Sequence, residues 1–238
     1  MKVNTDSIVL GSWALSLLHN DKHSSTNQQQ LSGLDIGSGS GLLSLMFAQG
    51  FCGDICIDAV ELNAIASGQG SENVKASPWP DAIVSHCADI RQFIQQRNTE
   101  LQYDVIISNP PYFPPASQPT KAYLKQTTAR LNARNQQSLP LDQLIDSIVQ
   151  TLAPTGLAFL AIPISQQVRV IELARTHRLS VSHSLQLKSK PDKLPYLACL
   201  AMSKMARQTD SSDLIIYQSN NVYTDSFRHL CANFYQHF

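Results

Sequence analysis

Short apolar runs alternate with helix-length amphipathic segments along most of this chain. The run at residues 103–108 (YDVIIS) is almost continuously apolar, which predicts a strand covered on both faces. Regular alternation of strands and helices predicts an α/β fold, a doubly wound, Rossmann-like, mostly parallel sheet with helices on both faces. The predicted strands are 31–36, 55–62, 82–85, 103–108, 157–162, 181–187, 195–203 and 213–217, and the predicted helices are 41–49, 64–76, 90–97, 141–152, 166–177 and a last one from residue 224.

The first apolar segment, residues 8–18, is interpreted as an amphipathic helix that packs on the body of the domain. It is too short to span a bilayer, and the polar residues that follow it do not form a signal-peptide cleavage site. A Ser- and Gln-rich loop then extends to residue 30. The pattern therefore predicts one domain over residues 1–238, with an N-terminal helix and loop to residue 30 and the α/β core from residue 31.

Composition narrows the class of protein. The 238 residues contain 18 Lys and Arg and 18 Asp and Glu, so the formal net charge is zero. A neutral chain is no polybasic nucleic-acid binder, and any such contact has to come from a local patch. The 5 cysteines are odd in number, form no C-x-x-C pair and lie in apolar segments. We interpret them as reduced, mostly buried thiols of a cytoplasmic protein, without a disulfide framework or zinc site.

A glycine-rich turn follows the first predicted strand, in the sequence Asp35-Ile36-Gly37-Ser38-Gly39-Ser40-Gly41. Glycines tolerate positive φ and let the backbone approach a ligand at the N-terminus of the next helix. The G-x-G-x-G spacing differs from the dinucleotide fingerprint and resembles motif I of S-adenosylmethionine (SAM) dependent methyltransferases. The resemblance implies that this turn lies under the methionine part of SAM and that the contacts come from Asp35, Gly37, Ser38 and Gly39. The alternative is an ordinary tight strand-to-helix turn.

Two acidic residues follow the next two strands. Glu61 ends the second strand, where a carboxylate can accept hydrogen bonds from both ribose hydroxyls of an adenosyl ligand. A solvated surface acid is the alternative. Asp89 follows the third strand, where the resemblance implies a hydrogen bond to the SAM adenine; an N-cap of the next helix is an equally good interpretation. The resemblance adds Leu62 and Ile90, the neighbours of these two acids, and also Asn109 to the cofactor site.

The sequence Asn109-Pro110-Pro111-Tyr112 after the fourth strand is the most specific signal in the chain. Two prolines fix the backbone and supply no N–H, so the turn presents acceptors and few donors. The Asn109 side-chain oxygen and the Pro110 carbonyl can accept both N–H bonds of a planar amine and orient it for attack on a methyl donor. Tyr112 can stack on the target group. A proline-rich loop is the alternative.

Strand topology predicts that these two turns meet. In doubly wound sheets the first and fourth strands are neighbours at the topological switch point, where ligands bind beyond the carboxyl ends of the strands. The glycine-rich turn and the Asn109 turn would then face one cleft, where methyl transfer requires neither a metal nor a nucleophilic side chain.

The N-P-P-Y sequence is shared by enzymes that methylate adenine N6, guanine N2 or a glutamine amide. The opening residues 2–13, the run from Glu61 to Trp79 and the closing residues 223–235 resemble the bacterial tRNA(Val) adenine-37 N6-methyltransferases. That resemblance implies a class I methyltransferase with seven strands and an antiparallel C-terminal strand, SAM as cofactor with S-adenosylhomocysteine (SAH) as product, a tRNA substrate and a cytoplasmic location. The sequence leaves the oligomeric state open, with a monomer as the default. The resemblance also places Thr5, Asp6 and Gly11 beside the SAM methionine. Family members usually carry a further aromatic and basic segment upstream of Thr5, whereas this chain begins at Met1.

A basic segment follows the catalytic turn. Between Asp104 and Asp142 the sequence has no acid, and its four positive residues are spaced as i, i+4 pairs. Such a segment could hold RNA phosphates beside the target base, or form a solvated basic face. The candidate RNA-binding residues are Lys121, Lys125, Arg130 and Arg134.

Three other functions stay open at the level of sequence. A release-factor glutamine methyltransferase typically has a separate N-terminal helical domain, for which there is no room before Leu31. A protein that binds SAM without turnover would keep the same turns. A nicotinamide dehydrogenase is disfavoured by the glycine spacing.

Overall fold

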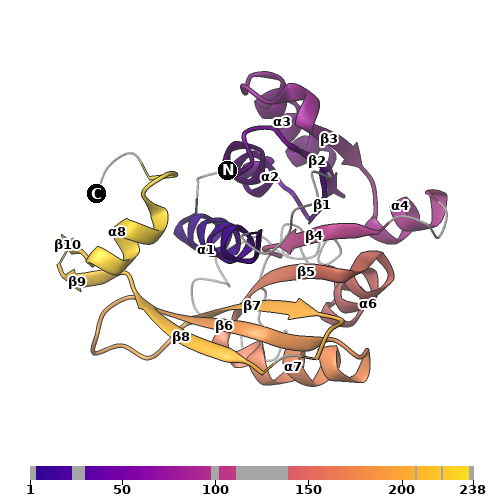
Figure 1. The fold of residues 1–238 in the computed structure, drawn as a ribbon. Coiled ribbons are helices and arrows are strands. Elements are labelled where there is room, and N and C mark those ends of the chain that lie inside the picture. Colours follow the sequence, from indigo (N-terminus) through magenta and orange to yellow (C-terminus); the bar gives the residue numbers. More distant parts are fainter. Residues whose placement is uncertain are drawn as a thin grey trace, which may run out of the picture.

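A central sheet of eight strands organises the fold in the computed structural model, which describes residues 4–22, 30–97, 102–110, 139–206, 208–220 and 222–235 (Figure 1). The strand order is β3-β2-β1-β4-β5-β7-β6-β8, so β1 and β4 are neighbours as predicted. The strands are β1 (Leu31–Ile36), β2 (Ile55–Glu61), β3 (Ile83–Cys87), β4 (Tyr103–Ser108), β5 (Leu152–Pro163), β6 (Ser180–Lys188), β7 (Leu197–Ser203) and β8 (Asp210–Ile215).

Strand directions confirm the doubly wound, mostly parallel sheet. Every neighbouring pair is parallel except those formed by β7, which is antiparallel to both β5 and β6. The sheet has the eight strands that the sequence pattern predicts and not the seven that the resemblance implies, because β8 adds a further parallel strand to the edge of β6. The antiparallel strand therefore lies inside the sheet, and the last strand of the sheet is parallel. A separate antiparallel pair is formed by β9 (Tyr217–Ser219) and β10 (Val222–Tyr223).

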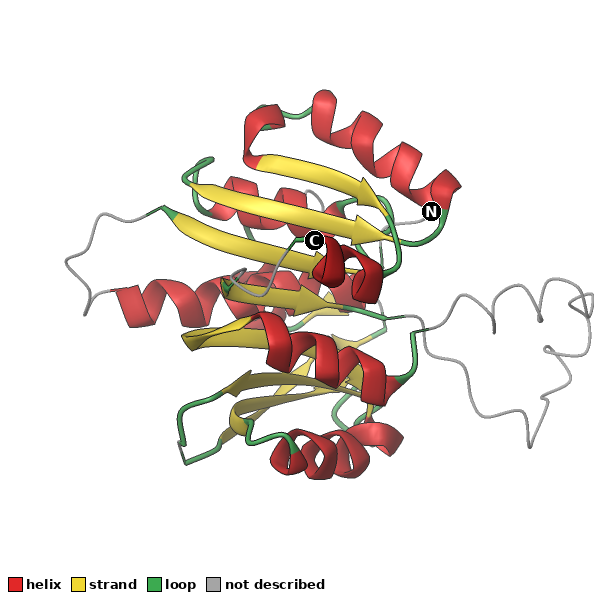
Figure 2. Ribbon diagram, turned by 90° about the vertical axis from the view of Figure 1, so that its right-hand side faces the viewer, coloured by secondary structure: helices red, strands yellow, loops and turns green. Residues whose placement is uncertain are grey.

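Helices cover both faces of the sheet (Figures 1 and 2). Alternate residues of each strand enter different cores: in β4, Val105 and Ile107 join one hydrophobic cluster and Ile106 joins the other. The first cluster is covered by α1 (Thr5–Lys22), α2 (Leu42–Gly50), α3 (Ala64–Lys75) and α8 (Asp225–Cys231), and the second by α4 (Ile90–Gln96), α6 (Leu141–Thr151) and α7 (Gln167–Thr176). Short 3₁₀ turns occupy Pro80–Ala82 and Ile164–Gln166.

The first helix, α1, packs on the domain but is not amphipathic, so that part of the prediction is wrong. Its successive residues Ile8, Val9 and Leu10 are all buried, although they point in three directions around the helix. The reason is that α1 contacts β5 and β7 on one side and both α2 and α8 on others. No helix among the described residues has the length and apolar character needed to cross a membrane.

The prediction that most cysteines are buried is also wrong. Cys199 and Cys231 are buried, whereas Cys52, Cys56 and Cys87 are exposed. The three exposed thiols each lie within two residues of the end of a helix or strand, where the covering layers stop. All five are free thiols.

Candidate active site

The glycine-rich turn, residues 37–41, connects β1 to α2 and has the backbone conformation that its sequence predicts. Gly37, Gly39 and Gly41 have φ values of 73°, 57° and 80°, in the left-handed region that disfavours other residues. The Gly37 and Ser38 amides donate to the Val60 carbonyl at 2.8 and 3.1 Å, which fixes the turn to the end of β2. A Cβ atom built on Gly37 would meet nothing within 4 Å, so the turn faces open space at this point.

Glu61 connects the end of β2 to the glycine-rich turn. One carboxylate oxygen accepts from the Gly39 amide at 2.9 Å, and the other accepts from the Asn63 amide at 2.7 Å. Each carboxylate oxygen can accept more than one hydrogen bond, so both retain capacity for a hydroxyl donor. The strand-end acid is therefore a fixed part of the turn, and it is not a freely solvated side chain.

Asp35 is a buried carboxyl group beneath the turn. Its Oδ2 accepts from the backbone amide and the hydroxyl of Ser44 at 3.2 and 2.7 Å, and its Oδ1 has no hydrogen-bond partner among the described residues. Burial raises the pKa of Asp35 to about 7, although the hydrogen bonds from Ser44 oppose the shift; the nearby Glu61 charge adds to it.

The shifted pKa of Asp35 predicts a pH dependence of stability. Between the ordinary value of 3.8 and about 7, the folded state holds a proton that the unfolded state has lost. The free energy of unfolding should therefore fall as pH rises through this window, by at most about 1.4 kcal/mol per pH unit, and level off above it. Asp35→Asn removes the titration, so urea unfolding of wild type and variant from pH 5 to 8 should give a stability difference that changes with pH. Asp54→Asn, at an exposed position, is the control, and a constant Asp35 difference would contradict the assignment.

Asp89 is the N-cap of α4. Its Oδ1 accepts from the Arg91 backbone amide at 2.8 Å, and its Oδ2 lies 2.9 Å from the Arg91 guanidinium. The Arg91 side chain holds the pKa of Asp89 below its ordinary value. The capping interpretation is confirmed; the adenine contact stays a prediction. Of the two apolar neighbours, Leu62 is exposed and Ile90 is buried.

Asn109 follows β4 directly and lies at the same edge of the sheet as the glycine-rich turn. Its side-chain amide donates to the Ser7 hydroxyl at 2.7 Å. Ser108, the preceding residue, donates its hydroxyl to the Ile36 carbonyl at 2.8 Å. Because Ile36 immediately precedes Gly37, this bond joins the starts of the two turns. The starts of the two turns therefore lie side by side, with Pro110 buried beside Asn109, and a common cleft between the turns stays a prediction.

The first turn of α1 lies at the same edge of the sheet as the two turns. Thr5 and Asp6 lie in the first turn of the helix, and the Asp6 carboxylate accepts from the Tyr196 hydroxyl at 2.8 Å. Gly11 lies further along, where an added Cβ would come within 2.6 Å of the Met46 side chain, so it permits close packing of α1 on α2.

Several predicted residues lie outside the described part of the chain: Pro111, Tyr112, Lys121, Lys125, Arg130 and Arg134. Sequence reasoning missed Ser7, Ser108 and Tyr196, all of which make side-chain hydrogen bonds at this edge. Ser7 and Ser108 stand next to the predicted residues Asp6 and Asn109, but no spacing rule assigns a role to either serine or to Tyr196.

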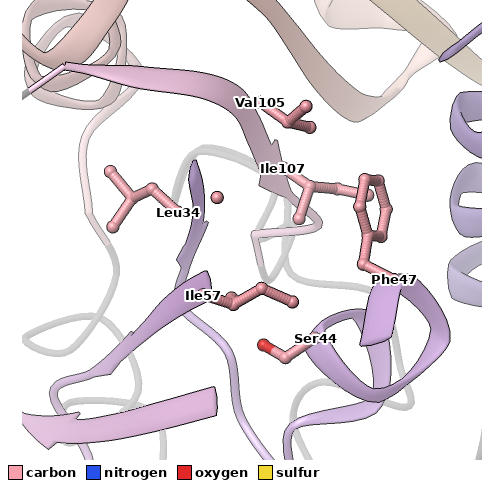
Figure 3. A pocket seen from close by; sticks show the side chains of 7 residues that line it. Leu34, Ser44, Phe47, Ile57, Val105 and Ile107 are labelled. Atoms are coloured by element: carbon pink, nitrogen blue, oxygen red, sulfur yellow. The ribbon is translucent and has the colours of Figure 1, made fainter. Parts of the chain in front are cut away.

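The pocket in Figure 3 is lined by none of the candidate site residues described above. Its lining comes from β1, β2, β4 and α2 and is apolar apart from Ser44, as the close view shows. It lies in the packing between the sheet and α2, and we assign it no ligand. The described residues contain no group of three or more His, Cys, Asp or Glu side chains placed to hold a metal ion.

The sheet order and the two facing turns at the β1–β4 switch point define a class I methyltransferase. The family model for the methyltransferase small domain matches residues 16–136. A tRNA1(Val) (adenine(37)-N6)-methyltransferase of Pectobacterium carotovorum is 38% identical over 99% of this chain and 87% of that protein, and one of Yersinia pestis is 35% identical over the same shares. The chain belongs to the tRNA1(Val) (adenine(37)-N6)-methyltransferase family.

Solved structures share the fold at low sequence identity. A predicted O-methyltransferase from Agrobacterium tumefaciens superimposes with a TM-score of 0.67 at 11% identity, covering 95% of each chain. A type I restriction-modification methyltransferase subunit from Streptococcus thermophilus gives 0.65 at 12% identity, covering 98% of this chain and 52% of that one. These likenesses confirm the architecture alone.

Proposed function

We propose that this protein transfers the methyl group of SAM to N6 of an adenine in tRNA, with adenine 37 of tRNA1(Val) as the first candidate. The observation that carries the proposal is the hydrogen bond between Ser108 and the Ile36 carbonyl, which joins the glycine-rich turn to the Asn109 turn at 2.8 Å. Cofactor and target amine would meet where these two turns meet. The curated relatives, named for this modification, support the choice of substrate.

The residues present fit SAM. The buried Oδ1 of Asp35, without a partner among the described residues, suits a ligand that brings an N–H donor, such as the SAM ammonium group. The space above Gly37 admits the methionine part close to the backbone. Glu61 would accept from the ribose hydroxyls, while Asp89, Leu62 and Ile90 would surround the adenine ring. Thr5 and Asp6 would lie at the methionine end.

The catalytic turn orients the amine. The oxygen of the Asn109 side chain and the carbonyl of Pro110 accept the two N–H bonds of adenine N6, which aims the nitrogen lone pair at the methyl group. These acceptor dipoles are fixed before reaction and stabilise the positive charge that develops on nitrogen. When bound, SAM would supply an electrophilic methyl group on a positively charged sulfur; the S–CH₃ bond would break as the C–N bond forms, and the amine would then lose one proton to water. Tyr112 is proposed to stack on the base.

Incubation with radiolabelled SAM and unmodified tRNA, followed by nucleoside mass analysis, tests the proposal. The expected product is N6-methyladenosine in tRNA1(Val). Methylation of another nucleoside would refute the target. Stabilisation of the protein by SAM without transfer to any tRNA would favour a SAM-binding protein without turnover.

The four basic residues after the catalytic turn yield a separate prediction. If Lys121, Lys125, Arg130 and Arg134 neutralise phosphates, changing all four to alanine should reduce the slope of log affinity against log salt by about 3. Filter binding of tRNA at several salt concentrations measures the slope. Replacing Arg169 and Arg175, both exposed on α7, is the control for loss of positive charge elsewhere. An unchanged slope in the fourfold variant would leave these residues as a solvated face.

A further inference from the structure

The amide group of Asn109 has two chemically different ends, and only one suits the proposed reaction. Its oxygen accepts from a target amine, whereas its nitrogen would place donors against donors. Rotation of the side chain by half a turn exchanges the two ends. Some other group must therefore decide which end faces the substrate.

Ser7 is in contact with the nitrogen end. The Asn109 Nδ2 atom donates to the Ser7 Oγ atom at 2.7 Å, across 102 residues of sequence. Since the amide is planar, an Nδ2 atom that faces Ser7 leaves Oδ1 on the opposite side of the group. A hydroxyl can also donate to an amide oxygen, so the contact holds this orientation because the Ser7 hydroxyl acts as the acceptor here.

The surroundings hold Ser7 rigidly. The Ser7 amide donates to the Asn4 carbonyl at 3.1 Å, in the first turn of α1. The neighbouring Asp6 is fixed to Tyr196, whose carbonyl accepts from the Ile164 amide at 3.1 Å just beyond β5. Burial and the Asp6 charge raise the pKa of Tyr196 well above its ordinary value, so this phenol remains a donor at neutral pH. The next residue, Ile8, is buried in the core.

We propose that Ser7 is a positioning residue for methyl transfer: its hydroxyl accepts from Asn109 Nδ2 and thereby presents Asn109 Oδ1 to the target amine. This inference rests on the proposed function, because it assigns a task to Asn109 in that reaction. It adds a residue of the N-terminal helix to the catalytic arrangement. Ser7 itself contacts neither the amine nor the methyl group.

Kinetics of Ser7→Ala test the proposal. We expect kcat to fall about ten-fold, the effect of one lost hydrogen bond, while the Kd for SAM and the melting temperature stay close to those of wild type. Ser7→Thr retains a hydroxyl and should retain most of the activity. The double variant Ser7→Ala/Asn109→Ala should be no slower than Asn109→Ala alone, because Ser7 acts only through Asn109.

A matched control is Ser16→Ala on the same helix, where the hydroxyl donates to the Trp13 carbonyl at 2.7 Å. It should leave kcat unchanged. An unchanged kcat in Ser7→Ala would overturn the proposal. So would an increased kcat, because that result would mean that the Ser7 hydroxyl donates to Asn109 Oδ1 and withholds it from the substrate.

A second measurement separates this inference from the proposed function. The side-chain NH₂ pair of Asn109 can be assigned in a ¹⁵N-correlated NMR spectrum by its disappearance in Asn109→Ala. Ser7→Ala should shift this pair and speed its exchange with water, and Ser16→Ala should not. If wild type methylates no tRNA, the proposed function fails, and the NMR result still decides whether Ser7 holds the amide. An unmoved pair would refute the contact.

Discussion

Replacing Asn109 by alanine is expected to lower methyl transfer by about a thousand-fold, because the variant loses a preorganised acceptor for the target amine. SAM affinity should stay within a few-fold of wild type, since the proposed cofactor contacts come mainly from the glycine-rich turn and the ends of β2 and β3. Single-turnover transfer to tRNA and calorimetric titration with SAM measure the two effects separately.

Two further variants make this result specific. Asn109→Asp keeps an oxygen acceptor at the same position and should lose less activity than alanine. Asn220→Ala removes an exposed asparagine that binds Lys190 and should have no effect. A large loss of SAM binding or of melting temperature in Asn109→Ala would show that Asn109 has a structural role. Near-normal transfer would remove Asn109 from the mechanism.

The core strands were predictable from local sequence. Both β1 and β4 have the predicted bounds, because a turn-forming sequence follows each strand directly: Gly37 after β1, and Asn109 and Pro110 after β4. The strand β5 begins earlier than predicted, at Leu152, even though Pro154 and Gly156 look like turn signals. A Cβ on Gly156 would lie 2.8 Å from the Tyr103 carbonyl, so glycine permits a close approach here. The β4–β5 register shifts between the Tyr103–Leu152 and Val105–Leu157 pairs, so these residues form an irregularity within the strand.

Which strands pair with each other in the sheet was harder to predict from the sequence. All residues of β7 are buried, and an apolar run of this kind predicts a strand covered on both faces. It does not say that the strand lies between β5 and β6, because hydrophobicity carries no information on pairing partners. The burial of α1 on several sides was missed for the same reason, since α8 comes from the other end of the chain.

In the candidate site, too, local features were predictable from the sequence and tertiary contacts were not. Turn geometry at Gly37, Gly39 and Gly41 was predictable, because only a few backbone conformations suit such a sequence. The N-cap role of Asp89 is also local. The contact between Ser7 and Asn109 depends on the tertiary fold, which brings residues far apart in the sequence together. A serine in the first turn of a helix does not by itself indicate such a contact.

Replacing Glu61 by alanine is expected to raise the Kd for SAM about a hundred-fold, since two charge-assisted hydrogen bonds to the ribose would be lost. The turn itself would also loosen, because the Gly39 and Asn63 amides lose their acceptor. The Kd of Glu61→Gln for SAM should lie between those of wild type and Glu61→Ala. The side-chain oxygen of the glutamine can accept from either the Gly39 or the Asn63 amide, while its NH₂ group would face the remaining amide as a second donor.

The comparison of SAM with SAH identifies the cause of this loss. Both ligands contain the ribose, whereas only SAM carries the sulfonium charge. If Glu61 accepts hydrogen bonds from the ribose hydroxyls, the affinities of Glu61→Ala for SAM and SAH should fall by similar factors in calorimetric titrations. If its charge merely attracts the cation, SAM should lose far more than SAH. Glu72→Ala, an exposed α3 position with the same charge change, should alter neither affinity, and unchanged SAM binding in Glu61→Ala would exclude Glu61 from the cofactor site.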